Sequence, residues 1–195
     1  MLERAGVFVL LLAAIVLRAR QAAAGFDREF DGHQGAIFAI AAVNYERFGV
    51  GRFHGYPALI VDVPEGAEQG EFDSGDALVY ANHPPLVPLL AWSFVNLLGP
   101  RGWNDAWREA RAPDGVELAL RLPFLALHLL WLWLFHGLVR KCAGSGVALT
   151  ALAVAAFSPV TVLYGSLVNY ENAALPCIMI ALHAYVSGWR QPRRV

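Results

Sequence analysis

Residues 122–139, LPFLALHLLWLWLFHGLV, decide the fold class of this chain. They form an uncharged run of 18 residues, and a helix of that length crosses most of the roughly 30 Å apolar core of a bilayer. Two further uncharged runs follow at 143–170 and 172–189. Pro159 and Pro176 interrupt them, which transmembrane helices tolerate where neighbouring groups bind the freed carbonyls. These runs predict three membrane-spanning helices.

The composition agrees with an all-α integral membrane protein. Of the 195 residues, 57% are hydrophobic and 16% are charged, and the mean hydropathy is +0.45. Soluble domains carry roughly 25% charged residues, so an ordinary soluble enzyme is excluded. A formal net charge of −1 gives no basic surface for nucleic acid. The two cysteines are too few for a disulfide framework.

The N-terminus predicts a first membrane helix. Residues 5–17 are apolar, and the stretch can extend to residue 24 if Arg18 and Arg20 reach toward the membrane surface. The small residues 22–24 also suit signal peptidase, so a cleaved signal peptide stays an alternative.

The apolar run 86–99 decides the topology. Its 14 residues are typical of an interfacial or re-entrant segment. If it does not cross the membrane and the N-terminus is cytoplasmic, Arg4, Arg140 and Lys141 all lie inside, as the positive-inside rule requires. The long block 25–121 then lies outside, where loops of that length are exempt from the rule. A crossing segment would instead place the later basic residues outside.

The distribution of acidic residues supports this topology. Fourteen of the 16 acids lie between Asp27 and Glu117, and Glu171 lies at the tip of a second external hairpin. The predicted organisation is a first membrane helix or signal-like anchor at 1–24, an external loop with surface helices at 25–121, three membrane helices at 122–189 and a basic cytoplasmic tail at 190–195.

Within the external block, the apolar spacing over residues 34–48 predicts an amphipathic helix that ends at Gly49 or Gly51. We expect its apolar face to pack on the bilayer surface or on the membrane helices. Residues 56–63 are β-like, and residues 103–111 predict a second surface helix.

The first candidate site is the stretch FDREFDGH at 26–33, which includes Asp27, Asp31 and His33. Its acids and histidine suit a general base or a phosphate-facing cluster, and the alternative is a hydrated helix flank. A zinc site that adds His54 and His83 has no supporting ligand spacing, so no metal is predicted.

Two further motifs carry polar residues. Asn82 and His83 precede a double proline and a helix start, where a side chain can contact a phosphate, and the alternative is a simple turn and cap. Glu171 lies between two hydrophobic runs, where a carboxylate is a functional hypothesis, and the alternative is a polar hairpin tip. The histidines within the runs, His128, His136 and His183, are expected to be packed and hydrogen-bonded.

Taken in order, these motifs resemble the GT-C superfamily of polytopic glycosyltransferases. The likeness is in particular to the dolichyl-phosphate-mannose–protein mannosyltransferase-like and lipid A aminoarabinose transferase-like branches, and it covers roughly residues 5–189. The motifs that carry it are FDGHQ at 30–34, YANHPPL at 80–86, LRLP at 120–123, FSP at 157–159 and NYE at 169–171.

The resemblance implies transfer of a sugar from a polyprenyl-phosphate-linked donor on the external face of a cell membrane, expected to be the bacterial inner membrane. It implies that Asp31 is the general base, with Asp27 as the fallback, and that Glu171 orients the substrate or a cation. His83 would face the donor phosphate, with His33 and Asn82 as further substrate-binding residues.

The resemblance also bears on partners. Members of the superfamily have more spans than the four predicted here, so a fragment, or a second chain that supplies the missing spans, is expected. The donor and membrane lipid are the other expected partners. No cofactor is expected, and a divalent cation stays open. The alternative function is a non-catalytic remnant or an interaction subunit. A small transporter is disfavoured because the spans lack paired charges.

Overall fold

A computed structural model describes residues 2–22, 29–53, 56–57, 59, 85–103 and 115–189. The described residues are almost entirely helical and include no strand, which confirms the predicted all-helical class. The contacts divide the chain into two units. Unit 1 comprises Met1–Ala22 and Phe124–Val195, and unit 2 comprises Ala23–Pro123. The predicted domain boundaries stay predictions.

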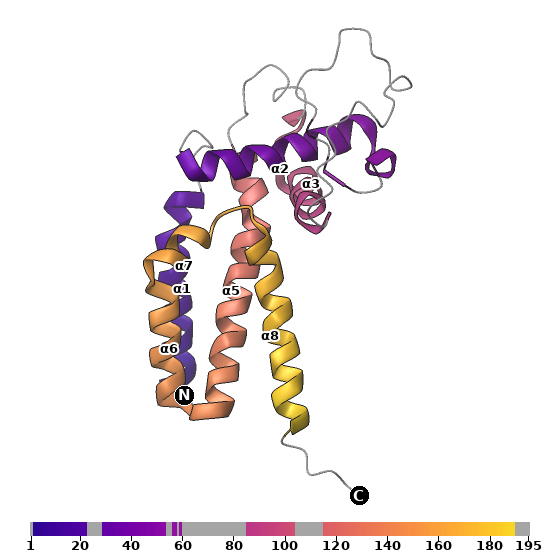
Figure 1. Ribbon diagram of the computed structural model, residues 1–195. Helices are drawn as coiled ribbons and strands as arrows, with labels where there is room; N and C mark the ends of the chain where they lie inside the picture. Colours follow the sequence, from indigo (N-terminus) through magenta and orange to yellow (C-terminus); the bar gives the residue numbers. More distant parts are fainter. Residues whose placement is uncertain are drawn as a thin grey trace, which may run out of the picture. The chain divides into compact units, whose positions relative to one another are not determined.

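Unit 1 is a bundle of long helices. Figure 1 shows α1, α5, α6 and α8 extending along a common direction. Buried Ala14, Trp131, Leu132, Leu152 and Ala156 form a core that joins α1, α5 and α6. The helices are α1 (Leu2–Ala22), α5 (Val116–Ala143, in unit 1 from Phe124), α6 (Ser145–Phe157), α7 (Pro159–Tyr164) and α8 (Tyr170–Trp189).

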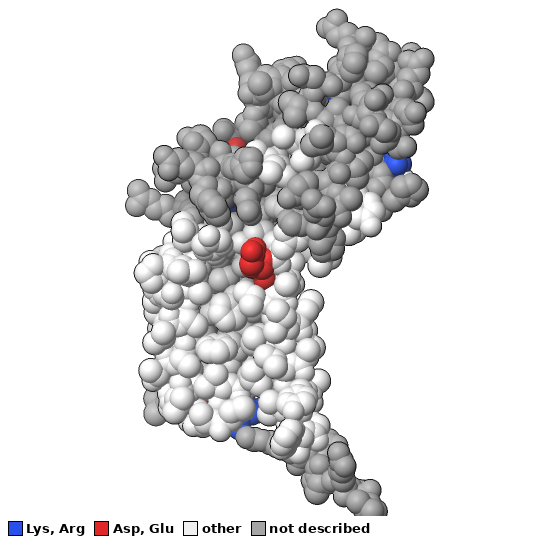
Figure 2. Space-filling model, viewed as in Figure 1, with Lys and Arg blue, Asp and Glu red and all other residues white. Residues whose placement is uncertain are grey.

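The surface of unit 1 is apolar over most of its length. The face in Figure 2 is uncharged between its ends, and large apolar side chains such as Phe8 and Trp133 are more than half exposed. Within the described residues, α5 is the one helix long and apolar enough to cross a membrane. An extended exposed apolar surface marks a contact with lipid or with other protein.

The predicted interruption of the run 143–170 at Pro159 is a full break between two helices, α6 and α7. The chain leaves helical geometry at Ser158, with φ −56° and ψ 133°, and α7 begins at Pro159. A proline has no N–H to donate and restricts the residue before it to extended conformations, so it favours the first position of a new helix. Residues 165–169 then form a non-helical loop before α8.

Unit 2 contains the helix predicted over 34–48. It is longer than predicted, since α2 spans Glu29–Phe48. It ends as expected at Gly49, whose φ of 83° suits glycine and whose N–H donates to the Tyr45 carbonyl at 2.9 Å. A short 3₁₀ helix, η1 (Val50–Phe53), follows. The next described helix is α3 (Leu86–Leu98), whose 13 residues extend about 20 Å.

The α2 helix packs against α3 through one acidic residue. Glu46 Oε2 accepts hydrogen bonds from Trp92 Nε1 at 2.9 Å and from Asn96 Nδ2 at 3.1 Å. The Tyr45 and Trp92 rings meet edge to face with centroids 6.4 Å apart. Trp103, which begins the second predicted surface helix, is buried and donates to Asn96. The rest of that helix and most of residues 56–63 lie outside the described residues.

Candidate functional site

The loop between α7 and α8 presents a buried polar group in unit 1. Four consecutive residues, Ser166 to Asn169, are at most 1% exposed. Asn169 caps α8, because its Oδ1 accepts a hydrogen bond from the Asn172 backbone N–H at 2.9 Å. Glu171 lies between these two asparagines and is exposed. The cap therefore fixes the helical turn that carries the Glu171 carboxylate.

Asn172 ties this loop together. Its amide Nδ2 donates to the Tyr164 carbonyl at 2.8 Å and to the Leu167 carbonyl at 2.9 Å. These two bonds leave Oδ1 facing His128 Nδ1 of α5, 3.0 Å away. One buried side chain therefore connects α5, the end of α7, the loop and the start of α8.

The two contacts of His128 Nδ1 require different tautomers. The Asn172 Oδ1 atom is an acceptor and requires a protonated Nδ1, whereas the Trp131 indole N–H donates to Nδ1 at 3.1 Å and requires an unprotonated one. The other ring nitrogen, Nε2, is buried and has no hydrogen-bond partner among the described residues. Such groups are rare in proteins, and a bound ligand is one explanation for them.

The loop also holds buried polar atoms that lack partners among the residues that the structure describes. Ser166 Oγ and Asn169 Nδ2 make no hydrogen bond to any of these residues. Both lie within five residues of Glu171 in the sequence. A buried donor or acceptor without a partner costs free energy, and a polar substrate can supply the missing bond.

Arg18 lies buried in unit 1, where it contacts the junction of α6 and α7. The sequence predicted that this arginine reaches the membrane surface, but it is 0% exposed. Its guanidinium donates to the carbonyls of Ala14, Ala156 and Thr161 at 2.9–3.0 Å. The break between α6 and α7 places the Ala156 carbonyl near a helix end, where carbonyls lack an intrahelical partner. The Thr161 carbonyl accepts the Gly165 N–H at 3.0 Å as well as the guanidinium, and these acceptors satisfy the buried arginine.

The predicted site residues fall in different parts of the chain. Glu171 is the second residue of α8 in unit 1, and the backbones of Asp31 and His33 lie near the start of α2 in unit 2. Asp27, Asn82 and His83 lie outside the described residues. The structure therefore describes Asp31 and Glu171 each within its own unit.

Arg18 and Asn172 are not among the site residues predicted from the sequence. The sequence places Arg18 at a membrane boundary, and Asn172 is marked only by its position next to Glu171. The expectation that the three helical histidines are packed and bonded is confirmed for His128 and for His183, whose Nε2 lies 2.7 Å from the Leu134 carbonyl. His136 lies 3.6 Å from Glu3. Among the described residues, no group of three histidine, cysteine or acidic side chains suits a metal ion.

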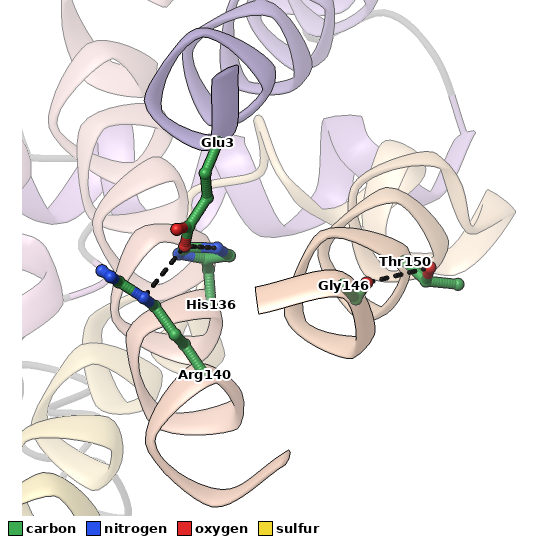
Figure 3. Close-up of polar contacts among 5 residues, drawn as sticks. All are labelled: Glu3, His136, Arg140, Gly146 and Thr150. Atoms are coloured by element: carbon green, nitrogen blue, oxygen red, sulfur yellow. Dashed lines mark hydrogen bonds and ion pairs between the residues drawn. The ribbon is translucent and has the colours of Figure 1, made fainter. Parts of the chain in front are cut away.

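We expect replacement of Asn172 by alanine to lower the free energy of unfolding by about 2 kcal/mol, because two carbonyls and a buried histidine lose their partner. The measurement is thermal or chemical unfolding of the purified chain in detergent. The matched control is Thr150→Ala, which removes an exposed hydrogen bond to Gly146 within α6 (Figure 3). Equal stability of the two variants would contradict this role for Asn172.

Comparison with known proteins gives a match for one part of the chain. A family model described as dolichyl-phosphate-mannose-protein mannosyltransferase matches residues 113–194. That range contains Glu171, Asn172 and His128, and it does not include Asp31. No curated protein and no solved structure matches the chain. Over residues 113–194 the chain is thus similar to the dolichyl-phosphate-mannose-protein mannosyltransferase family, and this confirms the predicted GT-C resemblance for that part of the chain.

Proposed function

We propose that this chain forms part of a membrane glycosyltransferase of the GT-C type. It would transfer a sugar from a polyprenyl-phosphate-linked donor to an acceptor on the external face of the membrane. The family match over residues 113–194 carries the proposal. The loop before α8 supports it, since that loop lies within the match and holds buried polar atoms without partners beside Glu171.

The proposed topology places α1, α5, α6 with α7, and α8 across the membrane. Arg4 follows the start of α1, and Arg140 and Lys141 lie at the end of α5. These positions suit a cytoplasmic side under the positive-inside rule. Glu171, at the start of α8, then belongs to the external side.

The proposed reaction has one base and one leaving group. The Asp31 carboxylate accepts the proton of the acceptor hydroxyl, whose oxygen attacks the anomeric carbon of the sugar. The bond between that carbon and the phosphate oxygen breaks, and polyprenyl phosphate leaves with the bonding electrons. His83 contacts the departing phosphate, and Glu171 orients the substrate. Both acids lie near helix N-termini, where the helix dipole favours an ionised carboxylate.

The transfer assay uses membranes that contain the chain and a polyprenyl-phosphate donor labelled in its sugar. We expect the unchanged chain to remove the labelled sugar from the lipid. The Glu171→Gln variant should do so about tenfold more slowly, because a substrate that is poorly positioned reacts slowly. The matched control is Glu117→Gln, which neutralises another acid in the first turn of a helix. Membranes without the chain set the background. Turnover no higher than this background would overturn the proposal.

A further inference from the structure

A cavity of about 760 Å³ lies in unit 1, lined by α1, α5 and His183 of α8. It is far along the bundle from the loop that carries Glu171, because its lining comes from the start of α1 and the last turns of α5. Its volume is within the range of roughly 300–1,000 Å³ that holds small ligands. None of the residues of the proposed transfer site lines it.

One wall of the cavity is apolar. Val7, Phe8 and Leu11 of α1 face Trp133 and Leu134 of α5. Phe8 is 66% exposed and Trp133 is 55% exposed, so both retain a large area that a ligand could cover. This wall extends along the helices and suits a hydrocarbon chain.

The other end of the cavity is cationic. It contains three basic side chains and one acid, Glu3, whose Oε1 lies 3.0 Å from Arg140 Nε (Figure 3). Lys141 Nζ donates to the Ser187 hydroxyl. Within the part of the chain that the structure describes, neither Arg4 nor Lys141 is paired with an acid, since Glu3 lies against Arg140. The charges of Arg4 and Lys141 can therefore meet an anionic ligand.

A buried polar atom also points to a ligand at this end. His136 lines the cavity and is 6% exposed, and its Nε2 has no hydrogen-bond partner in the described parts of the chain. It lies 3.6 Å from Glu3 Oε1, which is beyond a hydrogen bond. His183 is held differently, since its Nε2 lies 2.7 Å from the Leu134 carbonyl and fixes α8 against α5. The cavity thus has one histidine held by a carbonyl and one buried nitrogen that makes no hydrogen bond within the described residues.

We propose that this cavity binds an anionic phospholipid. The phosphate lies between Arg4 and Lys141, His136 Nε2 bonds an oxygen of the headgroup or its ester, and one acyl chain covers Phe8 and Trp133. Basic pockets between membrane helices on the cytoplasmic side favour such lipids, since the charge and the apolar wall match the two halves of the molecule. The inference rests on the membrane topology of the proposed function and is independent of sugar transfer.

The test uses the whole chain, purified in mild detergent and titrated with phosphatidylglycerol or phosphatidylcholine while native mass spectrometry counts bound lipid. We expect phosphatidylglycerol to bind at least tenfold more tightly. The double variant Arg4→Gln/Lys141→Gln should abolish this preference, and Trp133→Ala should weaken phosphatidylglycerol binding without a change of charge. The matched control, Arg47→Gln/Arg101→Gln, makes the same change in net charge in unit 2 and should retain the preference.

Several results would overturn the proposal. These are equal affinity for the two lipids, an equal loss in the control variant, and full competition by an equal concentration of inorganic phosphate. Circular dichroism checks that the variants fold, and Arg4→Lys should bind phosphatidylglycerol normally.

The orientation of the chain in the membrane is tested separately in a Cys177→Ala background. A membrane-impermeant maleimide that labels Cys142 from outside intact cells would contradict the proposed topology. The titration in detergent tests lipid binding separately from the topology.

Discussion

Replacement of Asp31 by asparagine is expected to abolish sugar transfer and to leave membrane insertion unchanged. Asparagine has nearly the same shape as aspartate but cannot accept a proton from the acceptor hydroxyl. A positioned general base contributes roughly 10²–10⁴-fold to a reaction, so turnover should fall at least about 100-fold. Insertion should persist because Asp31 lies near the start of α2, outside the proposed membrane helices. The measurements are turnover of the labelled lipid donor and the amount of chain in the membrane fraction.

The control for Asp31 is its neighbour Glu29. Glu29→Gln makes the same change in charge in the same helical turn, so it separates the role of one base from the charge of the whole cluster. We expect Glu29→Gln to keep most of the activity. Unchanged turnover in Asp31→Asn would end the assignment of Asp31 as the base, and equal losses in both variants would replace it with a general electrostatic effect.

The sequence predicts the helices of this chain better than the contacts between them. The apolar run 122–139 lies within α5, and the run 172–189 lies within α8, because an uninterrupted apolar stretch has few alternatives to a helix. Pro159 and Pro176 look alike in the sequence, yet only Pro159 separates two helices. The difference depends on partners distant in the sequence.

The break at Pro159 is stabilised by groups that local patterns cannot reveal. The Thr161 hydroxyl bonds the Ser158 carbonyl at 2.9 Å and lies against the Ala155 carbonyl. Arg18, 138 residues from Ala156, bonds the Ala156 carbonyl. An arginine near the end of an apolar helix usually extends to water, and its burial becomes predictable only when the free carbonyls of another helix are known.

In the candidate site, too, one residue is recognisable from the sequence and its contacts are not. Glu171 stands out in the sequence because it is an isolated acid between two apolar runs. Its supporting residues, Asn172 and His128, lie 44 positions apart and meet only through the packing of α5 against α8. Asparagine is common in turns, so the position of Asn172 in the sequence does not reveal that its side chain makes three hydrogen bonds.

The second large effect is expected for Arg18→Met, which should lower the free energy of unfolding by about 3 kcal/mol. Methionine preserves most of the length of the side chain but donates no hydrogen bond. The carbonyls of Ala156 and Thr161 would then be buried without this partner at the junction of α6 and α7. Loss of the desolvated cation offsets part of this cost, which is why the expected value is no larger.

Gly165 gives an independent test of the same contact. A methyl group at Gly165 would clash with the Arg18 side chain and with the Thr161 carbonyl that Arg18 bonds, so Gly165→Ala should disturb this contact and destabilise unit 1 in the same direction. The control is Arg4→Met, which removes an exposed arginine from the same helix and should change stability by less than about 0.5 kcal/mol. Unfolding in detergent, followed by circular dichroism, measures all three variants. If Arg18→Met were as stable as Arg4→Met, the guanidinium would not hold the broken helix in place. The bonds from Arg18 would then be a consequence of the break at Pro159 rather than one of its supports.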